Sequence, residues 1–86
     1  MPIETAELDR LQQAYKAAVD EWVAAIREEE ALATTDYSLP AWERWDAAGF
    51  KEQDAQEKAK TAREAYKDGL RQRDYGFLTG HLFRIT

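Results

Sequence analysis

Residues 34–40, with the sequence Thr-Thr-Asp-Tyr-Ser-Leu-Pro, separate two long segments of helical pattern and therefore decide the fold. Threonine, aspartate and serine side chains compete with a helix for backbone hydrogen bonds, and proline is excluded from a helix interior. The same segment favours a new helix, because Ser38 is a good N-cap and Pro40 is tolerated in a first turn. Tyr37 and Trp42, on either side of that cap, have the spacing of a hydrophobic staple. We expect one helix to end here, a bend at residues 34–38, and a second helix to follow.

The segment before the bend repeats apolar residues at intervals of seven. The resulting stripe contains Leu8, Tyr15 and Trp22; Leu11, Ala18, Ala25 and Leu32; and Val19 and Ile26 at one edge. A stripe of this width is typical of a helix packed in a bundle rather than in a narrow two-stranded zipper. It predicts a helix over residues 3–33.

The segment after the bend keeps the same period with smaller side chains. One series contains Trp45, Glu52, Ala59 and Tyr66, and the other contains Ala48, Ala55, Ala62 and Gly69. Gly49 lowers helix stability by about 1 kcal/mol relative to alanine, which raises the question of a kink there. The stripe keeps its phase across Gly49, so we expect one helix over residues 39–73.

Folding the chain back about Tyr37 brings the two stripes together. Trp22 then lies near Glu52 and Ala55, Tyr15 near Ala59, and Leu8 near Tyr66. Large residues on the first helix meet small ones on the second, which lets two helices approach closely. The predicted fold class is all-α: two long antiparallel helices in a coiled-coil-like helical hairpin, forming a single domain over residues 1–86.

Length and composition limit the classes of protein that fit. The chain has 86 residues, no cysteine and a formal net charge of −5. Its longest apolar run, residues 22–26, is far short of the roughly 18 residues that indicate a membrane span. Acidic residues near the N-terminus do not fit a secretory signal. We therefore expect no membrane association and a cytoplasmic location, which the absence of cysteine also favours.

Residues that could carry chemistry are few and scattered. His81 is the single histidine and Ser38 the single serine, so no catalytic triad or histidine-based metal site can be assembled. The consecutive acids Glu28, Glu29 and Glu30 point in different directions on a helix. Two carboxylates on the stripe, Glu29 and Glu52, are the remaining candidates for acid–base chemistry, and we expect them at the solvated edge or in ion pairs. The sequence predicts no enzyme, cofactor or metal.

A basic cluster ends the second helix, at Arg63, Lys67, Arg71 and Arg73. Helix C-termini favour such residues for dipole reasons alone, and Asp68 and Asp74 interrupt the cluster. Because the chain is acidic overall, we expect no nucleic-acid binding.

The candidates for an interaction surface are apolar residues off the stripes, together with two tryptophans near the bend that either cap the end of the hairpin core or form a binding surface. They are Val23, Trp42, Trp45, Phe50, Phe77, Leu78, Leu82, Phe83 and Ile85. The last five belong to an apolar C-terminal segment, residues 74–86, which either folds back over the open end of its own hairpin or reaches another subunit or protein.

A hairpin has only one interface in which to bury apolar surface, so we expect a non-enzymatic protein that acts through protein–protein contacts. The favoured arrangement is a homodimer forming a four-helix bundle. Two alternatives remain open. One is an adaptor or inhibitor hairpin that binds a different protein. The other is a small ligand-binding protein or enzyme that uses the aromatic cluster near the bend, which consists of Trp22, Tyr37, Trp42, Trp45 and Phe50.

Overall fold

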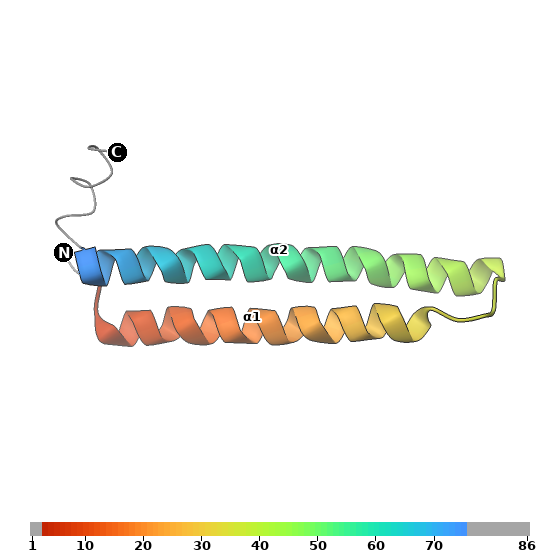
Figure 1. Cartoon of the computed structure of the whole chain (residues 1–86), viewed down its shortest axis with the longest axis horizontal. Helices are drawn as coiled ribbons and strands as arrows, with labels where there is room; N and C mark the ends of the chain where they lie inside the picture. Colours follow the sequence, from red (N-terminus) through yellow and green to blue (C-terminus); the bar gives the residue numbers. More distant parts are fainter. Residues whose placement is uncertain (1–2, 76–86) are drawn as a thin grey trace, which may run out of the picture.

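A computed structural model describes residues 3–75 of the chain and shows a helical hairpin (Figure 1). Helix α1 runs over Thr5–Leu32 and helix α2 over Leu39–Tyr75. The two helices lie side by side and antiparallel, so the first turn of α1 and the last turn of α2 share one end (Figure 1). The predicted hairpin is confirmed, and its helix limits lie within two residues of those expected from the sequence.

The break between the helices is made by the residues that predicted it. Ala33, just past α1, has an extended backbone (φ −72°, ψ 116°). The Ser38 hydroxyl caps α2 by accepting a hydrogen bond from the Ala41 N–H at 3.4 Å. The expected staple is wrong in one respect: Tyr37 is 88% exposed, so it buries little surface against Trp42.

The core between the helices consists almost entirely of alanine. Leu8 is the one large side chain in residues 3–74 that is buried, with 5% of its surface exposed. The other buried hydrophobic residues are Ala25, Ala41, Ala48, Ala55 and Ala59. The buried residues of the predicted series on α2 are Ala48, Ala55 and Gly69, which lie seven or fourteen residues apart. The series also extends one repeat closer to the bend than expected, to the buried Ala41. Small residues on α2 thus allow the helices to approach closely.

The register between the helices differs from the expected one by roughly one helical turn. The Trp22 indole donates a hydrogen bond to Glu52 at 2.7 Å, as the expected proximity requires. Farther from the bend, however, Tyr66 stacks on Tyr15, with ring centroids 6.1 Å apart, and not on Leu8. Leu8 and Leu11 lie against Gly69 instead.

The bend explains this shift. Glu29, three residues before the end of α1, lies beside Gly49, which is ten residues into α2. At 1.5 Å per residue, α2 therefore projects about 10 Å beyond α1. Residues 33–38 cover this distance because extended backbone advances about 3.3 Å per residue. Figure 1 shows the projecting end of α2 and the connecting segment beside it.

Helix α2 continues through Gly49 without a break, so a single helix is confirmed. A Cβ atom at Gly49 meets only the tip of the Glu29 side chain, with Oε2 at 2.8 Å. We expect Gly49→Ala to raise the free energy of unfolding by about 0.5–1 kcal/mol, because alanine is the better helix former and the Glu29 carboxylate can swing away. Urea unfolding followed by circular dichroism measures the change.

Gly69→Ala is the matched control for this substitution. A Cβ atom there meets methyl groups of Leu11 at 2.9 Å, Leu8 at 3.1 Å and Ile3 at 3.3 Å. Overpacking of about 1–3 kcal/mol offsets the gain in helix propensity, so we expect no stabilisation. Equal stabilisation by both substitutions would contradict the close approach of the helices at Gly69.

Candidate functional site

The hairpin has two broad sides of opposite character. On one side, which we call the charged flank, Lys51 of α2 pairs with Glu28 of α1 at 3.0 Å. Glu28 and Lys51 belong to a shallow groove of about 350 Å³, whose lining residues are Glu21, Ala24, Ala25, Glu28, Lys51, Asp54, Ala55 and Lys58. Successive residues on a helix are rotated by about 100° about the helix axis. Residues on the opposite side of the buried stripe from Glu28 and Lys51 therefore form the other flank of the hairpin.

That opposite side, which we call the apolar flank, gathers large apolar residues from both helices. They are Val19, Trp22, Val23 and Ile26 of α1 and Trp42 and Trp45 of α2. Trp22 and Val19 are half-buried, whereas the other four are exposed, Ile26 to 40% and Trp42 to 53%. The hydrogen bond from Trp22 to Glu52 connects the helices on this side. The apolar flank is a hydrophobic surface, rich in tryptophan, on the half of the hairpin that contains the bend.

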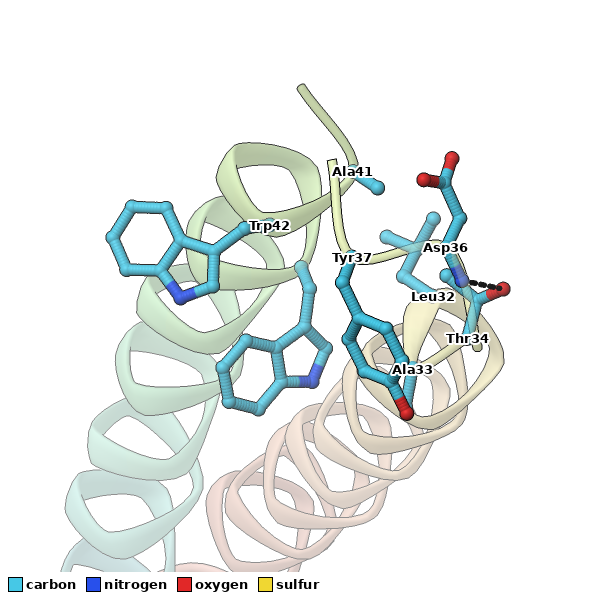
Figure 2. A pocket seen from close by; sticks show the side chains of 8 residues that line it. Leu32, Ala33, Thr34, Asp36, Tyr37, Ala41 and Trp42 are labelled. Carbon is cyan, nitrogen blue, oxygen red and sulfur yellow. Dashed lines mark hydrogen bonds between the residues drawn. The ribbon is translucent and has the colours of Figure 1, made fainter. Parts of the chain in front are cut away.

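At the bend, the apolar flank continues into a pocket of about 270 Å³, which we call the bend pocket. Its lining residues are Leu32, Ala33, Thr34, Asp36, Tyr37, Ala41, Trp42 and Trp45. The Tyr37 and Trp42 rings come from the connecting segment and from α2, respectively (Figure 2). The pocket exists because α2 projects beyond α1. The first turns of α2 therefore lie opposite the connecting segment and not opposite α1.

Hydrogen bonds within the connecting segment support this pocket. The Asp36 N–H donates to the Thr34 hydroxyl at 3.3 Å (Figure 2), and the Asp36 carboxylate accepts from the Ser38 N–H at 3.0 Å. The hydrogen bond from the Ser38 backbone, and then that from its hydroxyl, hold the pKa of Asp36 below its ordinary value of 3.8. The ionised carboxylate therefore favours the folded bend.

A titration tests this role of Asp36. Because its pKa is lowered in the folded state, its stabilising contribution is present above pH 3.8 and is lost as the pH falls through the lower folded-state value. Carboxyl-carbon NMR should give a midpoint below 3.8 for Asp36. In Ser38→Ala, which keeps the backbone N–H, the midpoint should move only part of the way back. A midpoint at or above 3.8 in the unaltered chain would contradict the hydrogen-bonded bend.

The structure places the sequence-based candidates for an interaction surface as follows. Val23, Trp42 and Trp45 are exposed and share the apolar flank. Phe50 is exposed as well, but its position on α2 faces away from α1, so it does not belong to that flank. Phe77, Leu78, Leu82, Phe83 and Ile85 lie outside the described residues.

Two residues expected in the core stripe lie elsewhere in the structure. Ile26 was assigned to the core stripe, yet it is 40% exposed, because it lies at the edge of the stripe. Leu32 was also assigned to the stripe, but it lines the bend pocket, because α1 ends before the projecting part of α2. The edge position of Ile26 was the sequence signal for its exposure.

The two stripe carboxylates lie in different surroundings. Glu52 accepts a hydrogen bond from the Trp22 indole, and Glu29 lies over Gly49. Across residues 3–75, no group of three or more histidine, cysteine, aspartate or glutamate side chains is close enough to hold a metal ion. Nor is either described helix long and apolar enough to cross a membrane.

Comparisons with protein families, curated proteins and solved structures gave no match to this chain. The apolar flank and the bend pocket are therefore the features of this chain that bear on its function.

Proposed function

We propose that this protein acts without catalytic chemistry, through protein–protein contact, and that its partner is a second copy of itself. The observation that carries the proposal is the apolar flank, where Val23, Ile26, Trp42 and Trp45 are exposed together on one side. Large apolar patches on a small protein mark interaction surfaces, and tryptophan contributes strongly to binding free energy. We assign the protein to the cytoplasm, because a chain without cysteine gains nothing from an oxidising compartment.

The composition of the core supports self-association. The interface between α1 and α2 buries Leu8 and several alanines, so it removes little apolar area from water for each ordered residue. Small domains with one such interface are marginally stable. A two-fold dimer that joins two apolar flanks covers Trp42, Trp45 and Ile26 in both copies and forms a four-helix bundle.

A charge placed on the apolar flank should weaken the dimer. We expect Ile26→Glu to raise the dimer dissociation constant by at least about tenfold, or 1.4 kcal/mol, because it buries an unpaired carboxylate between the copies. Sedimentation velocity at several protein concentrations measures this constant.

Phe50→Glu is the matched control. It introduces the same charge at an exposed large apolar residue of the other helix, on the side that faces away from α1. We expect a dissociation constant close to that of the unaltered chain. Equal weakening by both substitutions would place the contact elsewhere, and a second protein that binds the flank of a monomer would replace self-association.

A further inference from the structure

We propose that two copies associate antiparallel and that residues 76–86 of each copy bind the bend pocket of the other. This inference depends on the self-association proposed above, to which it adds the arrangement of the copies and the occupant of the pocket. Four features carry it: the size of the pocket, the reach of residues 76–86, the charge of the two ends of the hairpin, and the symmetry of the dimer.

The bend pocket suits apolar side chains of a peptide segment. Its volume of about 270 Å³ is below the roughly 300–1,000 Å³ usual for small-molecule sites. Its aromatic walls, Trp42 and Trp45, are exposed, and the apolar flank continues from it. Residues 77–85 supply five large apolar side chains, Phe77, Leu78, Leu82, Phe83 and Ile85. One of these fills the pocket while its neighbours cover the adjoining flank.

The segment cannot reach the pocket of its own chain. Along α2, Tyr75 lies about 45–50 Å from the pocket residues Trp45 and Ala41, at 1.5 Å per residue. Ile85, the last of the five apolar residues, lies at most about 36 Å from Tyr75 even in a fully extended chain. These residues can therefore fill a bend pocket only in a second copy.

Charge favours the bend over the open end of the hairpin. Residues 27–46, which form the bend end, carry six acidic and two basic side chains. Residues 76–86 carry Arg84, His81 and no acidic side chain. At the open end, residues 3–10 and 60–75 together carry six acidic and six basic side chains, so that end has no net attraction for a basic segment.

An antiparallel dimer satisfies both copies at once. Val23 lies about 27 Å from the start of α1 on a hairpin of about 55 Å, so it is near the middle of the length. A two-fold axis near Val23 brings together the mid-length parts of the two apolar flanks, around Val19, Val23 and Ile26. It places each bend, with Trp42 and Trp45, beside the last turn of the partner's α2. The assembly is then a closed dimer that adds no further copies, because each C-terminal segment occupies one pocket and each pocket receives one segment.

The absence of cysteine allows a direct test on the full chain by site-specific spin labelling. A nitroxide is attached to Thr86→Cys, and this copy is mixed with an unaltered ¹⁵N-labelled copy. We expect the indole N–H signals of Trp42 and Trp45 in the ¹⁵N copy to broaden more than that of Trp22, which lies near mid-length. The matched control carries the nitroxide at Thr35→Cys, an exposed position in the bend, and it should leave Trp42 and Trp45 sharp.

Each other result overturns the inference. Broadening from the Thr35→Cys label but not from Thr86→Cys indicates a parallel dimer. A dimer in sedimentation that shows broadening from neither label leaves self-association standing and removes the segment from the pocket. A monomer in sedimentation overturns both this inference and the proposed function.

Discussion

Leu8→Ala should lower the free energy of unfolding by about 2–5 kcal/mol, the cost of deleting a buried leucine side chain. Leu8 is 5% exposed and is the one large buried residue that residues 3–74 contribute to the core. Its methyl group also lies 3.1 Å from the Cβ position of Gly69, so its loss leaves a gap between the helices. Urea unfolding at a fixed protein concentration measures the change, since dimer stability depends on concentration.

Leu39→Ala makes the same chemical change at an exposed position. Leu39 begins α2 and is 66% exposed, so its truncation should change the free energy of unfolding by less than about 0.5 kcal/mol. Similar losses in Leu8→Ala and Leu39→Ala would show that Leu8 is not part of the core.

Ala59→Leu should destabilise the hairpin by about 1–3 kcal/mol, because it forces added methylenes between closely packed helices. Ala59 is 3% exposed, the lowest value in the alanine core. Its helix propensity hardly differs from that of leucine, so the loss reports packing alone. The midpoint of thermal or urea unfolding measures it.

Ala47→Leu provides the comparison on the same helix. Ala47 is exposed, and the substitution should change the unfolding free energy by about 0.5 kcal/mol or less. An unchanged stability in Ala59→Leu would mean that Ala59 does not face α1.

The sequence predicted the hairpin because its signals are local. Ser38 and Pro40 mark the start of α2, and the spacing of Ala48, Ala55 and Gly69 marks its buried side. These features depend on residues within a few turns of one another, and the structure has them all.

The apolar pattern does not determine the register between α1 and α2. The apolar positions of each stripe lie three or four residues apart, so the two stripes remain matched after a slip of about one turn. Leu8, expected beside Tyr66, thus lies against Gly69. The path of residues 33–38 decides between the two registers, because extended backbone lets α2 project past α1. Folding the helices back symmetrically about Tyr37 does not take the length of this extended segment into account.

The same projection created the bend pocket, which the sequence analysis located only as an aromatic cluster. Trp42 and Trp45 were expected at the bend, but the contribution of Leu32 and the connecting segment depends on where α1 ends. Ile26 shows a second property that the sequence pattern does not determine, the exposure of a residue at the edge of a stripe. The spacing of Ile26 assigned it to the stripe, but its 40% exposure depends on how the opposite helix packs against the edge of that stripe.

The most direct test of self-association is the mass of the unaltered chain by sedimentation equilibrium across micromolar concentrations. The proposal predicts a mass that rises with concentration from 9.9 kDa towards twice that value. A mass of 9.9 kDa at every concentration would contradict it.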